Sequence, residues 1–190
     1  MSNLPSIFIA NEFFDALPIK QLVKKKDKWY EKNIKYSKSH KPKFLDKLIN
    51  IKKFERKIGF KISHKQKFIE YSPLSIEYLK FISKIIKHKS GGLLIIDYGY
   101  TDEKMKNTLK SISKHKLNNV LENFGKSDIS YDINFKLIEK IVTKLGLKVN
   151  GITNQKKFLQ ELGILKRAEI ISKNLPFSEK ANIYFRVKKL

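Results

Sequence analysis

The chain has 190 residues, with 41 Lys plus Arg against 18 Asp plus Glu, a formal net charge of +23 and no cysteine. The lack of cysteine excludes a disulfide scaffold, a cysteine nucleophile and a thiolate metal site. At 41% hydrophobic and 12% aromatic residues the chain is too apolar for a disordered polycation, so we expect one folded domain. The sequence shows no membrane-spanning run and no signal-peptide pattern, and we expect a soluble intracellular protein.

The positive charge has two interpretations. A protein of this charge attracts phosphate, as nucleic-acid binders do. Only three of the cationic residues are arginine (Arg56, Arg167 and Arg186), although arginine grips guanine edges and phosphates better than lysine, and the lysines are spread along the chain. Lysine codons are also rich in A and T, so biased coding explains much of the excess. A non-catalytic basic module that binds nucleic acid or an acidic protein stays as an alternative function, but specific nucleic-acid binding is not favoured.

The N-terminal third is predicted to be mostly extended. The β-forming run Ser6–Ala10 predicts a strand that is buried on both faces, as in a parallel sheet. Ile19–Val23 and Trp29–Tyr36 flank a lysine-rich turn and predict a hairpin. Residues 37–65 are polar and weakly patterned, and we expect a loop with one helical turn near Phe44–Ile51.

The middle of the chain predicts a helix followed by a second strand. Ser72 is a good N-cap and Pro73 suits the first helical position, and apolar residues then recur at helical spacing until Gly91-Gly92 ends the helix. Leu93–Ile96 predicts a second buried strand. This order of elements is half of a right-handed crossover unit, so we expect the two strands to be parallel neighbours.

The C-terminal part is predicted to be mainly helical. After an extended segment at Asn107–Lys116, helical spacing predicts a helix over Phe135–Leu145 that Gly146 closes. A short strand is expected at Val149–Thr153. Three further helices are expected over Gln155–Leu162, Ile164–Lys173 and Ser178–Leu190. No repeat or linker divides the chain, so we expect a single domain over residues 1–190.

Polar side chains follow both predicted parallel strands. Asn11 and Glu12, with Asp15 close behind, follow the first strand, and Asp97 and Tyr98 follow the second. In open α/β sheets the ligand lies beyond the carboxyl ends of the strands, so together these residues predict a site. The structural alternative is that Glu12 and Asp15 cap a short helix starting at Asn11, and that Asp97 only ends its strand.

Sequence motifs lie in order along nearly the whole chain. They are Ala10–Pro18 (ANEFFDALP), Trp29–Glu31, Glu70–Pro73, Gly91–Gly99, Thr108-Leu109, His115, Gly125-x-x-Asp128 with Phe135, and Gln155–Ile164. In this order they resemble the motifs of the MidA-type methyltransferases, a family of S-adenosylmethionine-dependent enzymes. The mitochondrial member of that family methylates an arginine of a respiratory complex I subunit.

The resemblance implies an α/β fold. The expected architecture is a partial Rossmann-like sheet of a class I S-adenosylmethionine-dependent methyltransferase, with a hairpin inserted at about residues 19–36 and added helices. The implied cofactor is S-adenosyl-L-methionine, and the implied substrate is a protein arginine. No metal is expected.

The resemblance also assigns roles to the strand-end residues. Glu12 and Asp15 are the catalytic candidates, because carboxylates hold a guanidinium by paired hydrogen bonds and help to take its proton. The expected cofactor residues are Asn11, Asp97 and Tyr98. The substrate-side candidates are His115 and Asp128.

The chain departs from the family's pattern in one motif. Where the family has Asp-x-Thr-x-His-Val-Asp-Phe, this chain has Asp128-Ile129-Ser130-Tyr131-Asp132-Ile133-Asn134-Phe135. Asp132 therefore stands in place of a histidine and Asn134 in place of an aspartate. If that histidine contacts the substrate in relatives, its role is in question here.

The motifs also begin at what resembles the fourth strand of the methyltransferase sheet. The glycine-rich cofactor loop and the acidic residue that binds the ribose precede that strand in relatives, and neither has a counterpart here. Loss of the neighbouring strand exposes a strand edge. The chain also stops where relatives continue into a final strand. We therefore expect a domain that is incomplete at both ends, either a fragment that is inactive alone or a chain that needs a second polypeptide for the missing half. We expect a cytoplasmic location in preference to the mitochondrial matrix.

Overall fold

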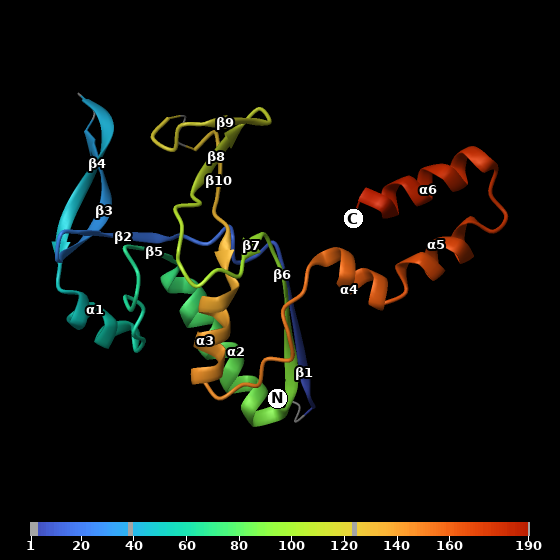
Figure 1. The fold of residues 1–190 in the computed structure, drawn as a ribbon, viewed down its shortest axis with the longest axis horizontal. Coiled ribbons are helices and arrows are strands. Elements are labelled where there is room, and N and C mark those ends of the chain that lie inside the picture. Colours follow the sequence, from blue (N-terminus) through green and yellow to red (C-terminus); the bar gives the residue numbers. More distant parts are fainter. Residues whose placement is uncertain (1–3, 38–39, 123–124, 190) are drawn as a thin grey trace. The chain divides into compact units, whose positions relative to one another are not determined.

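The structure is a computed structural model that describes residues 4–37, 40–122 and 125–189 (Figure 1). The chain divides into two compact units, Met1–Val149 and Asn150–Leu190. The first unit contains the strands and helices α1 to α3, and the second contains helices α4 to α6. A single domain over residues 1–190 stays a prediction.

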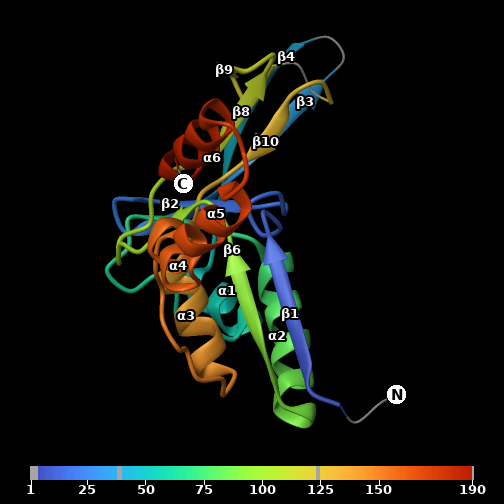
Figure 2. The same ribbon diagram turned by 90° about the vertical axis from the view of Figure 1, so that its right-hand side faces the viewer.

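The parallel strand pair that the sequence predicts is present in the first unit. β1 (Ser6–Asn11) and β6 (Gly91–Ile96) run parallel, with Ser6 opposite Gly91 and Asn11 opposite Ile96. Helix α2 (Pro73–Lys89) lies beside both strands (Figure 2). As predicted, Ser72 caps α2, because its hydroxyl oxygen accepts a hydrogen bond from the Ser75 N–H at 3.2 Å.

The prediction that Gly91-Gly92 ends the helix is wrong. Helix α2 already ends at Lys89, and the two glycines begin β6. Gly91 has a φ of +129°, and a Cβ atom at this residue would lie 1.9 Å from the carbonyl oxygen of Ser6. The close approach of β1 therefore requires glycine at position 91.

The prediction that β1 is buried on both faces is wrong. Its residues alternate between half-buried and exposed, and Ile7 and Ile9 are 80% and 69% exposed. On the opposite face Ala10, together with Leu93 and Ile95 of β6, packs against the core. Among the described residues β1 pairs only with β6. One apolar face and one edge of β1 are consequently open.

The predicted hairpin is confirmed and belongs to a larger sheet. An antiparallel sheet with the strand order β4-β3-β2-β5 is formed by β2 (Lys20–Lys25), β3 (Lys28–Ser37), β4 (His40–Ile49) and β5 (Phe68–Tyr71). The expectation of a loop over residues 37–65 is wrong, because β4 and helix α1 (Ile51–Ile58) occupy most of it. Residues 38–39 lie outside the described residues. β4 has a weak hydrophobic pattern, and pairing with β3 along its length gives it its extended form.

Two smaller sheets complete the first unit. One is antiparallel with the order β10-β8-β9, formed by β8 (Lys110–Ser113), β9 (Lys116–Asn118) and β10 (Asp128–Ser130). In the other, β7 (Gly99–Tyr100) pairs in parallel with β11 (Ile133–Asn134). Helix α3 (Phe135–Lys144) follows and Gly146 adopts a φ of +85°, which confirms the predicted helix and its glycine stop. The strand expected at Val149–Thr153 is not formed.

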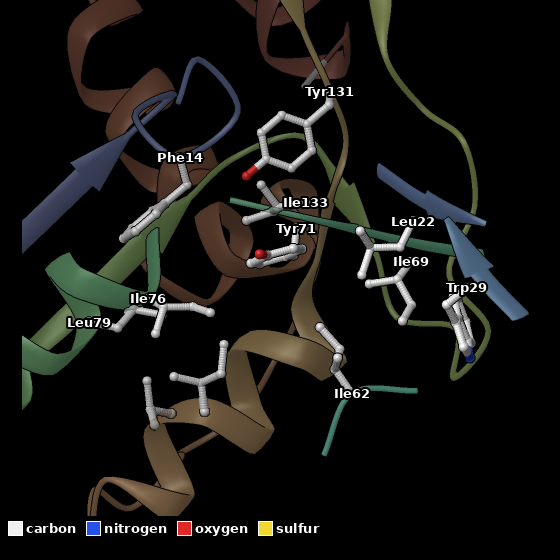
Figure 3. Packing of buried hydrophobic residues seen from close by; sticks show 12 residues of the cluster. Phe14, Leu22, Trp29, Ile62, Ile69, Tyr71, Ile76, Leu79, Tyr131 and Ile133 are labelled. Carbon is white, nitrogen blue, oxygen red and sulfur yellow. The ribbon is translucent and has the colours of Figure 1, made fainter. Parts of the chain in front are cut away.

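The hydrophobic core joins these elements (Figure 3). Phe14 from the loop after β1, Leu22 from β2 and Ile69 from β5 are fully buried. Leu79 from α2 and Ile141 from α3 are also at most 1% exposed. Side chains from the start of the chain and from residues more than one hundred positions later therefore form one core.

The second unit consists of three helices, as predicted. They are α4 (Gln155–Glu161), α5 (Ile164–Ser172) and α6 (Phe177–Lys189), and Leu190 lies outside the described residues. Asn154 caps α4 by accepting a hydrogen bond from the Lys157 N–H at 2.9 Å. In the part of the chain that the structure describes, no helix has the length and apolar character needed to cross a membrane.

Candidate functional site

The carboxyl ends of β1 and β6 are joined by hydrogen bonds. The Glu12 N–H donates to the carbonyl oxygen of Ile96 at 2.9 Å, which continues the strand pairing by one residue. The Oδ2 atom of Asp97 accepts hydrogen bonds from the N–H groups of Phe14 at 2.9 Å and Asp15 at 3.3 Å. The polar residues after the two strands therefore lie together, as the sequence predicts.

The two predicted catalytic carboxylates lie on this loop. Glu12 is exposed and has a φ of +45°, a left-handed conformation that is costly for a residue with a side chain. Asp15 is half-buried in the following turn, in which the Leu17 N–H donates to the Phe14 carbonyl oxygen. The alternative that these acids cap a helix starting at Asn11 is wrong, because no helix forms there.

No hydrogen bond or ion pair engages the carboxylate of Glu12 or Asp15 among the described residues. Other acids of the chain do have cationic partners, such as Glu31 with Lys20 at 2.6 Å. The two carboxylates at the strand ends are therefore available to a cationic group from outside the described chain.

The carboxylate of Asp97 is already occupied by backbone donors. Besides the two bonds to its Oδ2 atom, its Oδ1 atom accepts a hydrogen bond from the Tyr98 N–H at 2.8 Å. Burial and the neighbouring charge of Asp15 raise the pKa of Asp97, while the hydrogen bonds from the backbone act in the opposite direction. The other two predicted cofactor residues, Asn11 and Tyr98, are exposed at the same edge.

Tyr131 is a residue of the site that the sequence analysis missed. Its side chain is 5% exposed and lies in the core beside Phe14 and Ile133 (Figure 3). Its N–H donates to the carbonyl oxygen of Asp15 at 3.3 Å, and burial raises the pKa of its hydroxyl to about 12. A single tyrosine in a polar stretch has no hydrophobic period to reveal it.

A pocket lies beside Asp15. Its walls come from the loop before β2, from the residue before β8, and from β10 with the residue after it. The lining residues are Asp15, Ala16, Leu17, Pro18, Ile19, Leu109, Ile129, Ser130 and Tyr131. Asp15 is the only charged residue in this lining, and most of the other side chains are apolar.

The structure does not bring His115 and Asp128 to the strand ends. Lys114 and His115 form the two-residue turn between β8 and β9, with φ values of +50° and +60°, and His115 is exposed. Asp128 is exposed at the start of β10, opposite Ile112. Neither side chain forms a hydrogen bond or an ion pair with the strand-end residues in the described ranges. No metal-binding group of three or more His, Cys, Asp or Glu occurs among the described residues.

The residues that depart from the family's motif have structural partners here. Asp132 forms an ion pair with Lys110, with 2.6 Å between Oδ1 and Nζ. Asn134 caps α3 by accepting a hydrogen bond from the Leu137 N–H at 2.9 Å, and its Nδ2 atom donates to the Asp102 carbonyl oxygen at 3.1 Å. An ionised aspartate could cap the helix but could not donate the second bond.

Glu70 joins three segments beneath the site. It is 4% exposed, and its carboxylate accepts hydrogen bonds from Gln21 Nε2 at 2.6 Å and from the Thr108 N–H at 3.0 Å. The Thr108 hydroxyl also donates to Glu70 and, in turn, accepts the Asp132 N–H at 2.9 Å. The Glu70 and Thr108 motifs are thus explained by a buried hydrogen-bond network.

Parallel strands with polar residues at their carboxyl ends characterise α/β proteins that bind cofactors. Residues 1–153 match the family described as "Putative S-adenosyl-L-methionine-dependent methyltransferase", and the chain belongs to this family.

The chain is similar to the mitochondrial protein arginine methyltransferase NDUFAF7 of the frog Xenopus tropicalis. The two are 30% identical over 166 residues, which cover 87% of this chain and 38% of the relative. The human protein of the same name is 25% identical over 169 residues, which cover 87% of this chain and 37% of that protein. The chain therefore spans less than two fifths of the length of these relatives.

The fold is similar to that of a solved COG1565 superfamily protein from Burkholderia thailandensis that was crystallised with S-adenosyl-homocysteine. The TM-score is 0.74 at 19% identity, over 98% of this chain and 49% of that protein. A second structure of a COG1565 superfamily protein from the same organism gives a TM-score of 0.76 at 19% identity, over 100% of this chain and 52% of that one. The likeness confirms the predicted fold, a partial Rossmann-like methyltransferase sheet.

Proposed function

We propose that this chain forms the substrate side of an S-adenosylmethionine-dependent methyltransferase that methylates an arginine of a protein. The observation that carries the proposal is the pair of unengaged carboxylates, Glu12 and Asp15, at the carboxyl ends of two parallel strands in a chain of this family. By the family resemblance the substrate is a subunit of respiratory complex I. The frog relative is named a protein arginine methyltransferase, which also supports arginine as the substrate residue.

In this proposal Glu12 and Asp15 hold the substrate guanidinium by charge-assisted hydrogen bonds. When bound, S-adenosylmethionine would supply an electrophilic methyl group, with its sulfur as the leaving group. The carboxylates align the guanidinium nitrogen with the methyl carbon and accept the proton that this nitrogen loses. His115 and Asp128 would contact the rest of the substrate protein, at a distance from the reacting atoms.

The described residues fit one end of the cofactor. Asn11 and Tyr98 offer an amide and a hydroxyl at the exposed strand edge, which suit the amino and carboxylate groups of its methionine part. Asp97 contributes to this end of the cofactor site indirectly, because its carboxylate holds the loop of Phe14 and Asp15 by hydrogen bonds. No glycine-rich loop follows a strand among the described residues, so the ribose and adenine need a further segment.

We propose that this further polypeptide segment pairs with the open edge of β1 and covers Ile7 and Ile9. Apolar side chains that are 80% and 69% exposed on a strand with a free edge favour such a cover. The segment would correspond to the part of the relatives that this chain does not match. It can belong to the same protein or to a second polypeptide, and the proposed location is the cytoplasm, with the mitochondrial matrix as the alternative.

The test begins with the coding DNA that flanks this chain, which is read for a frame encoding a glycine-rich strand, loop and helix. The encoded segment is co-expressed with the chain, and S-adenosylmethionine binding is measured by calorimetry. Methyl transfer to protein is followed with a labelled cofactor. Glu12→Gln should lower the transfer rate about 100-fold or more with little change in cofactor affinity, whereas Glu77→Gln, at an exposed position of α2, should change neither.

Four results would count against these proposals. Absence of cofactor binding by the co-expressed pair contradicts the methyltransferase function. Full activity of Glu12→Gln contradicts the role of this carboxylate. Tight cofactor binding by the chain alone contradicts the need for a covering segment, and so does an Ile7→Ser, Ile9→Ser double variant that binds its partner as tightly as the unaltered chain.

A further inference from the structure

We propose that the pocket beside Asp15 is the binding site for the aliphatic stem of the substrate's cationic side chain, with the cationic group at the Asp15 carboxylate. The inference rests on the proposed function and adds to it the residues that select the substrate. These are Leu17 from the loop after β1, Leu109 before β8 and Ile129 on β10.

The pocket has the two kinds of surface that such a side chain needs. Leu17, Ile19, Leu109 and Ile129 provide an aliphatic wall. Methylene groups that pack on such a wall are removed from water, which favours binding of an alkyl stem. Asp15 provides the only charge in the lining. Apolar walls with one carboxylate favour a ligand that combines an alkyl stem with a cation.

The positive net charge of the chain favours binding of a cationic ligand at Asp15 over binding elsewhere on the surface. Lys plus Arg exceed Asp plus Glu by 23, so most of the surface repels a cation. The Asp15 carboxylate has no hydrogen-bonding or ion-pair partner among the described residues, so a cationic ligand does not have to displace a lysine. The pocket is therefore a place on this chain where a guanidinium is attracted at close range.

Backbone hydrogen bonds hold the walls of the pocket in place. The Asp15 N–H donates to Asp97 at 3.3 Å, and the Asp15 carbonyl oxygen accepts the Tyr131 N–H at 3.3 Å. β10 is paired with β8, with Ser130 opposite Lys110. The loop that carries Asp15 and the strand that carries Ile129 are thus fastened to each other, so the pocket is formed before a ligand binds.

The experiment uses the full chain with methyl groups labelled for NMR, and n-butylguanidinium as the probe. We expect the probe to shift the methyl signals of Leu17, Leu109 and Ile129. Guanidinium, which lacks the stem, and n-butylurea, which lacks the charge, should each bind about tenfold or more weakly. Equal affinity for n-butylurea, or shifts confined to other residues, would overturn the proposal.

Matched variants test the location of the site. Ile129→Trp should fill the pocket and weaken binding of n-butylguanidinium about tenfold or more, whereas Leu117→Trp, at an 80% exposed position of β9, should not. Asp15→Asn is a second variant that keeps the shape and removes the charge, and it should also weaken binding about tenfold. Unchanged affinity in Asp15→Asn contradicts the proposal.

The pocket and the proposed function can fail separately. If n-butylguanidinium binds the pocket but the co-expressed pair of polypeptides neither binds S-adenosylmethionine nor transfers a methyl group, the pocket stands and the methyltransferase function does not. If methyl transfer occurs and Ile129→Trp and Leu117→Trp leave the same KM for the protein substrate, the function stands and the pocket does not.

Discussion

The Oδ2 atom of Asp97 accepts the backbone N–H of Phe14 at 2.9 Å, across 83 positions of sequence. Phe14 is fully buried, and the same oxygen also accepts the N–H of Asp15. The loop that carries Glu12 and Asp15 is therefore anchored by the end of β6 and by the core at the same point. Asp97 positions the candidate site through the backbone of this loop.

Replacement of Asp97 by alanine should release this loop. The N–H groups of Phe14 and Asp15 would lose their acceptor, and we expect the free energy of unfolding to fall by about 1–3 kcal/mol. Hydrogen exchange at the two amides should accelerate, and urea unfolding measures the stability. Asp128→Ala, at an exposed position, is the control and should change the stability by less than about 0.5 kcal/mol. Unchanged exchange at Phe14 in Asp97→Ala would contradict the anchoring role.

The raised pKa of Asp97 gives the stability a pH dependence of known sign. Its ordinary value of 3.8 applies to the unfolded chain, and burial together with Asp15 raises the pKa in the folded protein. Between these two pKa values the folded state holds more protons, so the Asp97 contribution to stability is largest below pH 3.8 and falls as the pH rises through the folded pKa. Asp97→Asn has no titrating carboxyl group at this position, so its stability does not show this decrease with rising pH.

Urea unfolding of both proteins across this pH range measures the difference. The free energy of unfolding of Asp97→Asn minus that of the unaltered chain should increase from below pH 3.8 upward and then level off. A difference that is constant with pH, or that decreases, contradicts the raised pKa. Groups common to both proteins cancel in the comparison, apart from Asp15, whose charge interacts with that of Asp97.

The buried carboxylate of Glu70 should be essential for stability. Glu70→Ala leaves Gln21 Nε2 without one of its acceptors and the Thr108 N–H without its acceptor, in a region where Glu70 is only 4% exposed. We expect a loss of about 2–3 kcal/mol in the free energy of unfolding, because hydrogen bonds to a charged group are removed and a buried donor stays unpaired. Thermal and urea unfolding would measure it. Glu77→Ala on α2 should be near neutral, and an equal loss in both variants would show that the network contributes nothing.

Gly91 and Gly92 provide a matched pair of substitutions. A Cβ at Gly91 would lie 1.9 Å from the Ser6 carbonyl oxygen in a backbone with φ of +129°, whereas a Cβ at Gly92 meets nothing within 4 Å. Gly91→Ala should therefore force β1 away from β6 and cost more than about 2 kcal/mol. Gly92→Ala should stay within about 1 kcal/mol of the unaltered chain. Denaturant unfolding measures both values, and similar values for the two variants contradict the close approach of the strands.

Much of the fold could be predicted where the chemistry is local. Ser72 and Pro73 begin α2, the helical spacing before Gly146 gives α3, and the β-forming runs give β1 and β6. The meeting of Glu12, Asp15 and Asp97 followed from one rule, that parallel neighbours end at the same edge. The roles of these side chains in binding and catalysis stay predictions.

The errors lie where partners distant in sequence decide the structure. β4 has a weak pattern of its own and becomes a strand because β3 pairs with it. The exposed face of β1 has the composition of a buried strand, and only the absence of a cover among the described residues shows otherwise.

The sequence by itself determined the family, the parallel strand pair and the polar residues at its edge, because each depends on short-range patterns or on motifs in order. Only the tertiary structure decided which of these side chains have partners. It showed that the Asp97 carboxylate accepts hydrogen bonds from three backbone N–H groups, while the carboxylates of Glu12 and Asp15 have no hydrogen-bond or ion-pair partner in the described chain. It also placed Tyr131 against the loop of Asp15 and formed the pocket between them. Hydrogen bonds between segments more than eighty residues apart leave no local pattern in the sequence.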